Sequence, residues 1–339
     1  MPSIRLQKTG AEKHIALEHL DYAEVRDLLD IDAFYRLLGE REPSASDAVL
    51  RRFCEQDMVR ACDDGHYAIT NLGALLLARR LSDFSGLRKR AIRVIRYAGR
   101  ANLDILDDFE FDKGYALALP DAERQIMSLI PSWEEVDGAF RRIVSAYPQR
   151  AIRELLVNAV VHQDLSATDS SPLVCLYENR IEFSNPGESL IPVDRVLNAL
   201  PKTRNVGLVR LLRQMDLCEE GGTGWDRAVN ACEEARLMAP RIESSAELGT
   251  KVTMFSGSGF ARMSKSDRMD ATYWHACLMY AQSESMSNQT LRERFGLPAE
   301  TKSTVAISRL LRECCDAELI HEEDSDSGAR YRRYVPFWA

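Results

Sequence analysis

The residues best placed to do chemistry lie at 153–164, RELLVNAVVHQD, where an acid and an amide occur one helical turn apart. Residues i and i+4 of a helix project side by side, so Glu154 and Asn158 would point together from a mostly aliphatic segment. A carboxylate can orient a water molecule, and an amide oxygen can complete the oxygen shell of Mg²⁺, which keeps several waters and borrows phosphate oxygens. The spacing suits a Mg-nucleotide site; the alternative reading of this pair alone is an ordinary capped amphipathic helix.

The segments that would position this pair follow in order along the chain. Residues 180–184 alternate like a half-buried strand and run into the turn sequence Asn185-Pro186-Gly187. Three glycines within 221–224 precede the amphipathic run 226–235, so backbone N–H groups and a helix N-terminus would face one space and could bind phosphate. Residues 249–255 indicate a closing strand that is entered through a glycine.

In this order the four segments resemble the GHKL ATPase superfamily, which includes the gyrase B subunit, MutL and the histidine kinases. More narrowly, RELLVNAVVHQDL, FSNPGE and EEGGTGWDRA, with a C-terminal pattern that ends in YVPFWA, are similar to bacterial transcriptional regulators that couple such an ATP-binding domain to DNA-binding modules. The resemblance extends over residues 20–339. It implies an α+β fold in which a Bergerat-type α/β sandwich binds ATP.

The resemblance also implies roles for single residues. Glu154 would be the general base that polarises the attacking water, which favours hydrolysis over the phosphotransfer of relatives that carry an amide there. Asn158 would bind the Mg²⁺ that bridges the phosphates. His162 could touch phosphate or cap the helix end, and capping is favoured. The expected ATP-binding residues are Asn158, His162, Asn185, Gly187, Lys202, Arg204, Gly221, Gly222, Thr223, Gly224 and Thr250.

The chain departs from the superfamily at two places, so the sequence leaves open whether the protein hydrolyses ATP. Asn185 stands where most members have an Asp that accepts a hydrogen bond from adenine, so it would accept only as a neutral group, beside a Pro186 that has no N–H. This predicts weak adenine affinity. The lid is short, and its Lys202 and Arg204 would either pair with phosphates or form a solvated basic turn.

Length and composition indicate a cytoplasmic protein of two or three domains. At 339 residues the chain exceeds a single hydrophobic core of ordinary size. We expect no membrane association, because no run approaches the roughly 18 apolar residues of a membrane helix and no signal peptide is evident. The eight cysteines form no CxxC pair, which predicts neither zinc sites nor disulfides. The formal charge of −8 argues against a large nonspecific nucleic-acid surface, although a local basic face remains open.

Ahead of the proposed ATP-binding helix, the pattern predicts mostly helical structure. Residues 20–40 have helical periodicity, and 46–80 read as helix, hairpin and helix, similar to a small winged-helix unit. Residues 90–99 predict an apolar strand, 104–112 a solvated acidic loop, and 114–147 further helices.

The chain thus divides into an N-terminal helical, winged-helix-like region (1–88), a GHKL-like ATP-binding domain (89–256), a polar linker (257–268) and a C-terminal winged-helix domain (269–339). In the last domain we expect helices at 271–283, 288–295 and 301–315 and wing strands at 319–321 and 331–335. DNA binding would use Lys302, Ser303, Thr304, Ser308, Arg309, Arg312, Arg330 and Arg332, whose side chains suit phosphates and base edges. The alternative for this domain is dimerisation or docking of a partner protein.

The leading interpretation is an ATP-binding, DNA-associated regulator in which Mg-ATP controls the arrangement of a homodimer and DNA binding by its winged helices. Slow hydrolysis is left open. The related regulators commonly begin with a Schlafen/AlbA-type DNA-binding domain, and the segment before residue 20 is too short to hold one, so a partner protein would supply it or the protein acts without it. The alternative is a noncatalytic nucleotide-sensing scaffold or docking subunit of a multiprotein system, for example in antiphage defence.

Overall fold

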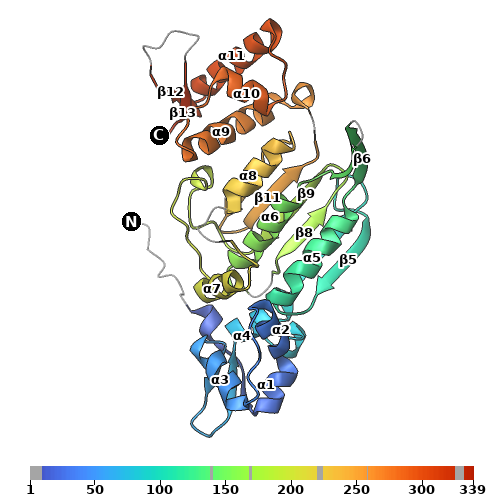
Figure 1. Cartoon of the computed structure of the whole chain (residues 1–339), viewed down its shortest axis with the longest axis vertical. Coiled ribbons are helices and arrows are strands. Elements are labelled where there is room, and N and C mark those ends of the chain that lie inside the picture. Colours follow the sequence, from blue (N-terminus) through green and yellow to red (C-terminus); the bar gives the residue numbers. More distant parts are fainter. Residues whose placement is uncertain (1–9, 138–139, 168–169, 220–223, 258, 325–331) are drawn as a thin grey trace.

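The computed structural model describes residues 10–137, 140–167, 170–219, 224–257, 259–324 and 332–339. Over these residues the chain is a mixed α+β protein built in three parts along its long axis (Figure 1). A central mixed sheet covered by helices lies between an N-terminal part and a C-terminal part. The buried apolar side chains form one continuous cluster that extends from Leu20 to Tyr334, so all three parts contribute to the same core.

The N-terminal part is a small three-stranded sheet packed against short helices. Its elements are η1 (Ala11–Lys13), β1 (Ile15–Leu20), α1 (Tyr22–Leu28), α2 (Ile31–Leu37), α3 (Ser46–Glu55), β2 (Val59–Ala61), β3 (Tyr67–Thr70) and α4 (Asn71–Leu77). The sheet is antiparallel in the order β1-β3-β2. The helix, hairpin and helix predicted for 46–80 are confirmed, and the Thr70 hydroxyl caps α4 by accepting from the Gly73 amide at 3.1 Å.

The central part holds the large sheet. Its elements are η2 (Leu81–Asp83), η3 (Arg88–Arg90), β4 (Ile92–Tyr97), β5 (Ile105–Phe111), α5 (Tyr115–Leu129), β6 (Ser132–Asp137), β7 (Phe140–Ser145), α6 (Gln149–Val161), β8 (Leu173–Leu176), β9 (Arg180–Asn185), η4 (Val193–Arg195), α7 (Val206–Gln214), α8 (Gly224–Glu234), β10 (Arg241–Ser245) and β11 (Gly249–Phe255). In the described part of the chain the strand order is β10-β11-β9-β8-β4-β5, with β4 and β8 parallel and the other pairs antiparallel. Helices α5, α6 and α8 lie side by side on one face (Figure 1).

A buried polar network holds the C-terminal end of α6 against the sheet. Arg90 is almost fully buried and donates to the backbone oxygens of Leu165 at 2.9 Å and Asp164 at 3.4 Å. The Tyr115 hydroxyl donates to the Arg90 carbonyl at 2.8 Å and accepts from the Gln163 side chain at 2.9 Å. Buried polar groups are costly unless they are hydrogen-bonded, so this network fixes where α6 ends.

Two predictions ahead of α6 are wrong. The acidic segment is not a solvated loop but the edge strand β5, because arginines of β4 neutralise it: Arg93 donates to Asp108 at 2.8 Å, and Arg96 lies 2.6 Å from Asp107. Helical structure does not continue to residue 147 but stops at Leu129, because the next residue, Ile130, precedes Pro131 and has the extended backbone that a residue before proline favours. The following residues pair as the antiparallel hairpin β6–β7.

The C-terminal part consists of η5 (Phe260–Arg262), α9 (Lys265–Ala281), α10 (Asn288–Arg294), α11 (Thr301–Asp316), β12 (Ile320–Glu322) and β13 (Tyr334–Pro336). Helix α9 begins well before the expected residue 271, because Ser264 and Asp267 form a capping box. The helices expected near 288–295 and 301–315 and the strand pairing near their end are confirmed.

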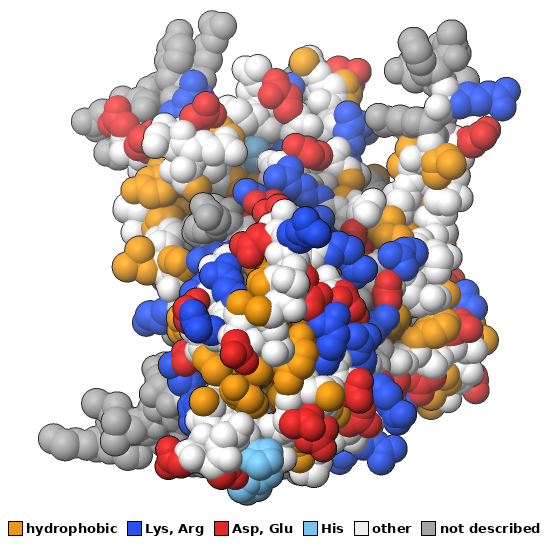
Figure 2. All heavy atoms as spheres, turned by 60° about the horizontal axis from the view of Figure 1, so that its bottom comes forward, with side chains coloured by type: hydrophobic (Ala, Val, Ile, Leu, Met, Phe, Trp, Pro, Cys, Tyr) orange, Lys and Arg blue, Asp and Glu red, His pale blue; other side chains and the backbone are white. Residues whose placement is uncertain are grey.

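Acidic and basic side chains are interspersed over the N-terminal end of the molecule, with scattered apolar side chains among them (Figure 2). This face therefore presents no field of a single sign. No helix among the described residues is both long and apolar enough to cross a membrane.

Candidate functional site

A cavity of about 610 Å³ lies between α6, α7, the start of α8 and the strands β9, β10 and β11. This volume is within the range of small-molecule and cofactor sites. The cavity brings together many of the residues predicted from the sequence: Glu154, Asn158, His162, Asn185, Lys202, Arg204, Gly224 and Thr250. Gly187 does not line it, and Gly221, Gly222 and Thr223 lie outside the described residues.

Glu154 and Asn158 of α6 form one end of the cavity, and both are covered by the first residue of α8. A methyl group built on Gly224 would lie 2.8 Å from Glu154 Oε2 and 3.5 Å from both terminal atoms of the Asn158 side chain. Glu154 is only 7% exposed, and this burial raises the pKa of its carboxyl group, opposed by the nearby Arg227. Backbone at the start of α8 therefore approaches an acid–amide pair without an intervening side chain.

The Asn158 side chain is the candidate metal ligand. Its carboxamide forms no hydrogen bond with any residue that the structure describes, so its oxygen is free to coordinate. Within the same residues no cluster of three His, Cys, Asp or Glu side chains could hold a metal by itself. A single amide oxygen fits Mg²⁺ that takes its remaining ligands from water and phosphate, and does not fit an all-protein cage.

The opposite end of the cavity is formed by the sheet. Asn185 pairs in register with Thr250, whose hydroxyl donates to the Gly187 carbonyl at 2.8 Å. Gly249 has a positive φ of 76°, and a side chain there would collide with the Asn185 carbonyl, so this close approach requires glycine. The apolar side chains of Phe183, Ile242 and Val252 complete this end. An apolar floor with a polar edge suits a flat aromatic ring such as a nucleobase.

Four cations line the cavity: Lys202, Arg204, Arg210 and Arg213. None forms an ion pair with an acid among the described residues. Sequence reasoning missed Arg210 and Arg213, although their spacing of three residues on an amphipathic segment places them on one helix face. A cavity with several unneutralised cations favours a polyanionic ligand.

His162 is the C-cap residue of α6 through its backbone N–H, which donates to the Asn158 carbonyl at 3.0 Å, and side chains of the segment after η4 bind the last carbonyls of the helix. Asn205 donates to the carbonyls of Val161 at 3.0 Å and Gln163 at 2.8 Å, and Arg204 donates to those of His162 at 3.4 Å and Glu188 at 2.6 Å. Burial, with a smaller contribution from Arg204, lowers the pKa of His162 to about 4. The imidazole therefore faces the cavity as a neutral group, and Arg204 is already used in part as a structural donor.

A second cluster that the sequence analysis missed stands beside Glu154. Arg227 forms an ion pair with Glu219 and has its Nη1 atom 3.8 Å from Glu154 Oε1. The ion pair lowers the pKa of Glu219, whereas burial raises the pKa of Asp226 to about 6. The sequence signal for this cluster was the presence of charged residues on both sides of the glycine-rich segment 221–224.

The residues predicted to bind DNA lie on α11 and the final hairpin. Lys302, Thr304, Ser308, Arg309 and Arg312 are exposed on α11, and Ser303 is half-buried. Arg309 pairs with Glu313 at 3.0 Å and Arg332 pairs with Glu322 at 2.9 Å. Arg330 falls outside the part of the chain that the structure describes.

The solved structures include a similar fold. The crystal structure of the DIP2311 protein from Corynebacterium diphtheriae matches with a TM-score of 0.57 and 17% sequence identity, over 96% of this chain and 64% of that chain. At this identity the likeness shows the fold alone, and this chain spans less than two thirds of the length of that protein. No curated protein matches the chain.

One family model matches part of the chain. Residues 169–254 match the family described as "Putative ATP-dependent DNA helicase recG C-terminal". The matched segment contains α7, α8 and the strands at the apolar end of the cavity, whereas α6 with Glu154 and Asn158 precedes it. This match supports an ATPase-like domain that includes most of the cavity wall.

Proposed function

We propose that this chain binds Mg-ATP in the cavity between α6, α7, α8 and the sheet. The observation that carries the proposal is the Glu154–Asn158 pair beneath Gly224, at one end of a cavity that is also lined by unneutralised cations. The ATPase-like family match over residues 169–254 supports ATP as the ligand. The GHKL-type arrangement and the use of Mg²⁺ are parts of this proposal.

Each end of the cavity has a distinct role in this proposal. Adenine lies on the apolar floor next to Asn185 and Thr250, and the triphosphate extends towards the cations of α7. Asn158 holds Mg²⁺, which when bound neutralises charge on the phosphate oxygens. Glu154 orients the attacking water and accepts its proton, and its raised pKa makes it a stronger base for a slow hydrolysis.

The experiment that tests the proposal compares ATP binding with Mg²⁺ and with excess EDTA, by equilibrium dialysis on the full chain. We expect ATP to bind at least about tenfold more tightly with Mg²⁺, since the cation offsets the repulsion between Glu154 and the phosphates. Equal affinities would contradict the metal site. Absence of ATP binding under both conditions would contradict the proposed function.

We further propose that the nucleotide regulates DNA binding by the C-terminal part. The proposal is that a homodimer changes its arrangement when Mg-ATP binds, and that winged helices present α11 to duplex DNA. Exposed Lys302 and Arg312, which form no ion pair with any described residue, support a phosphate-facing surface. The nucleotide would act by binding one dimer arrangement more tightly than the other.

A second candidate function is a nucleotide-sensing scaffold or docking subunit without catalysis. Val305, in the middle of the exposed face of α11, is 63% exposed, and Arg309 and Arg332 are already paired with acids. An apolar residue flanked by neutralised charges favours a protein partner over a phosphate backbone. The two candidates differ in whether Arg312 is needed for binding to DNA.

A further inference from the structure

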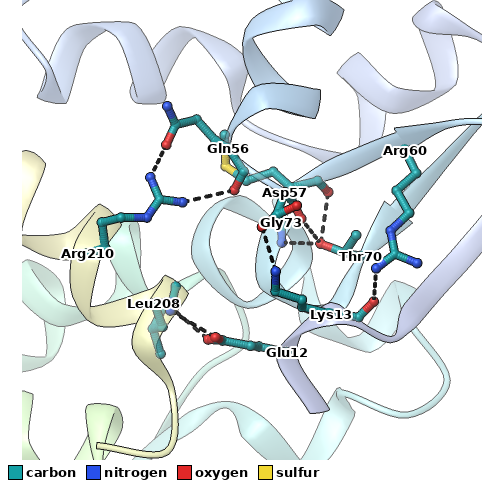
Figure 3. Close-up of polar contacts among 11 residues, drawn as sticks. Glu12, Lys13, Gln56, Asp57, Arg60, Thr70, Gly73, Leu208 and Arg210 are labelled. Atoms are coloured by element: carbon teal, nitrogen blue, oxygen red, sulfur yellow. Dashed lines mark hydrogen bonds and ion pairs between the residues drawn. The ribbon is translucent and has the colours of Figure 1, made fainter. Parts of the chain in front are cut away.

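Arg210 is a cation that faces the cavity and is held by neutral groups only. Its two terminal nitrogens donate to the side-chain oxygen and to the backbone oxygen of Gln56, the latter at 3.3 Å (Figure 3). Neutral acceptors orient a guanidinium group without cancelling its charge, and two of them fix its plane. Arg227, by contrast, is paired with Glu219 beside Glu154. Arg210 therefore keeps its charge and a defined position for an anion.

The contacts of α7 place Arg213 towards the Glu154 end of the cavity, and Arg210 lies one turn before it on the same helix face. Arg213, one turn further along α7, donates to the Glu219 carbonyl at 3.2 Å, and the Glu219 carboxylate is paired with Arg227 near Glu154. Arg210 and Arg213 share the helix face that lines the cavity. The two arginines thus face the region in which the proposed triphosphate lies.

Gln56 belongs to the N-terminal part of the chain, 154 residues away from Arg210 in sequence. Gln56 is 9% exposed and is the C-cap residue of α3, where its backbone N–H donates to the Arg52 carbonyl at 3.3 Å. A buried residue whose backbone is hydrogen-bonded at a helix end has little freedom to move. The position of a charged residue in the cavity wall is therefore set by a region that lies outside the ATPase-like match at 169–254.

Glu12 supplies a second contact from the same part. Its carboxylate is 6% exposed and accepts from the Gly207 amide at 2.8 Å and the Leu208 amide at 3.1 Å, at the N-terminus of α7 (Figure 3). A negative charge at this position satisfies free N–H groups and complements the helix dipole. Gly207 permits the approach, because a methyl group there would lie 3.1 Å from Glu12 Oε1 and 2.9 Å from Leu72 Cδ2.

The segment that carries Glu12 is itself tied to the N-terminal part. The Asn71 side chain donates to the Ala11 carbonyl at 2.8 Å, Lys13 pairs with Asp57 at 2.9 Å, and Arg60 donates to the Lys13 carbonyl at 2.9 Å. Asp57 directly follows Gln56 in the chain. The two contacts on α7 therefore come from one connected unit (Figure 3).

We propose that Arg210 binds the triphosphate of the nucleotide, and that Gln56 and Glu12 are the residues that position it. This inference rests on the proposed binding of Mg-ATP and names a contact within it. Because coupling between two sites is reciprocal, a triphosphate that binds Arg210 in this position also stabilises the contact of α7 with the N-terminal part. The N-terminal part then responds to the occupancy of the cavity.

The test measures Mg-ATP affinity by calorimetry on the full chain, for the wild type, Arg210→Ala and Gln56→Glu. The Gln56→Glu change keeps size and an acceptor oxygen but neutralises Arg210. We expect the dissociation constant to rise about tenfold in each variant, as for loss of one hydrogen bond to a charged group. Gln282→Glu, at an exposed position at the end of α9, is the charge-matched control and should bind as the wild type does.

A second readout separates positioning from general stability. In the wild type, Mg-ATP should slow amide hydrogen exchange at residues 10–14 and 206–210, and Arg210→Ala should abolish the slowing at 10–14. Glu12→Gln, which keeps one acceptor oxygen, should retain part of the nucleotide-dependent slowing at residues 10–14. Glu12→Ala should show no such slowing. A residue that only stabilises the fold would change exchange equally with and without nucleotide.

The outcomes distinguish this inference from the proposed function. If the wild type fails to bind Mg-ATP, both fall. If the wild type binds and Gln56→Glu binds equally well, or if Arg210→Ala leaves the nucleotide-dependent slowing at residues 10–14 intact, the inference is overturned and the proposed function stands. Thermal unfolding of each variant identifies any that fails to fold. In that case the positioning role is decided on the most conservative folded variant, Gln56→Glu.

Discussion

Single residues of the cavity combine burial with charge in ways that set their protonation. Glu154 is buried next to an amide and a cation, and burial has the larger effect on its pKa. His162 is half-buried next to the cation Arg204, and both its desolvation and this cation lower its pKa. These two residues therefore give the most direct tests at this scale.

Replacing Glu154 by Gln should separate binding from hydrolysis. The variant keeps the size of the side chain and an acceptor oxygen but cannot take a proton, so we expect phosphate release in single-turnover assays to fall by at least about 100-fold. The Mg-ATP dissociation constant should stay within about threefold of the wild type, since general-base catalysis acts on the transition state and not on binding. Glu188→Gln, another acid that lines the cavity, is the control. Unchanged release in Glu154→Gln would remove Glu154 from the chemistry.

The lowered pKa of His162 predicts a loss of stability in acid. The unfolded chain takes up a proton on this residue as the pH falls through its usual 6.5, whereas the folded chain does so only near 4. Stability is therefore lost between these pH values and not above them. From pH 7 to pH 4.5, urea unfolding should show the wild type losing about 2 kcal/mol more than His162→Gln. Equal losses would show that His162 is not buried as a neutral group.

The sequence identified much of the residue set because helix spacing and glycine positions are local properties. Glu154 and Asn158 are four residues apart, and Gly224 and Thr250 follow in recognisable segments, so the cavity brings them together. It did not reveal Arg210, whose partner Gln56 lies 154 residues away in sequence. The sequence placed His162 at the end of α6, where it is the C-cap residue, but it did not reveal Asn205, whose side chain reaches α6 through the tertiary fold.

At the scale of elements, α8 connects the cavity to the C-terminal part. Its first residue, Gly224, lies over the Glu154–Asn158 pair, and near its other end Glu233 contacts His275 of α9 at 2.9 Å and Arg294 of α10 at 3.8 Å. The Arg294 side chain is 1% exposed, and burial lowers its pKa. A displacement of α8 would therefore reach two helices of the C-terminal part directly.

Removing Glu233 should destabilise the protein strongly. Glu233→Ala leaves Arg294 buried without a carboxylate partner among the described residues, which typically costs about 3 kcal/mol or more. The exposed neighbour Glu234 is the control, and Glu234→Ala should change the free energy of unfolding by less than about 1 kcal/mol. The measurement is urea unfolding of both variants. A small effect of Glu233→Ala would show that α8 and α10 are not joined through this ion pair.

Elements were predicted from the sequence where periodicity and caps agree, and missed where tertiary contacts decide. The strand β9 alternates between buried and half-buried residues and runs into the Asn185-Pro186-Gly187 turn, and β11 is entered through Gly249. The segment of β5 is acidic, and it forms a strand because β4 places arginines opposite its carboxylates. The strand β1 depends on pairing with β3 across residues 21–66, which contain three helices and β2, and no local pattern reports such a pairing.

At the scale of the whole molecule, one continuous core joins the three parts, while their surfaces differ. Charges of both signs are interspersed on the N-terminal end (Figure 2), whereas α11 exposes Lys302 and Arg312 without ion pairs to described residues. The overall charge of −8 means that any contact with DNA must be local.

Duplex DNA binding through α11 gives a charge-reversal test. If α11 faces phosphates, Arg312→Glu should weaken a gel-shift or anisotropy signal by about tenfold or more and flatten its salt dependence. Val305→Ser, on the same exposed face, should leave DNA binding unchanged. Unchanged DNA binding by Arg312→Glu would instead favour α11 as a surface for a protein partner.

The most direct test of the central claim is a calorimetric titration of the wild type and Asn158→Ala with Mg-ATP. The account predicts that the wild type binds with one site and that Asn158→Ala loses at least about tenfold in affinity, while its thermal unfolding without nucleotide is unchanged. Equal binding by the two proteins, or no binding by the wild type, would contradict a Mg-nucleotide site at Glu154 and Asn158.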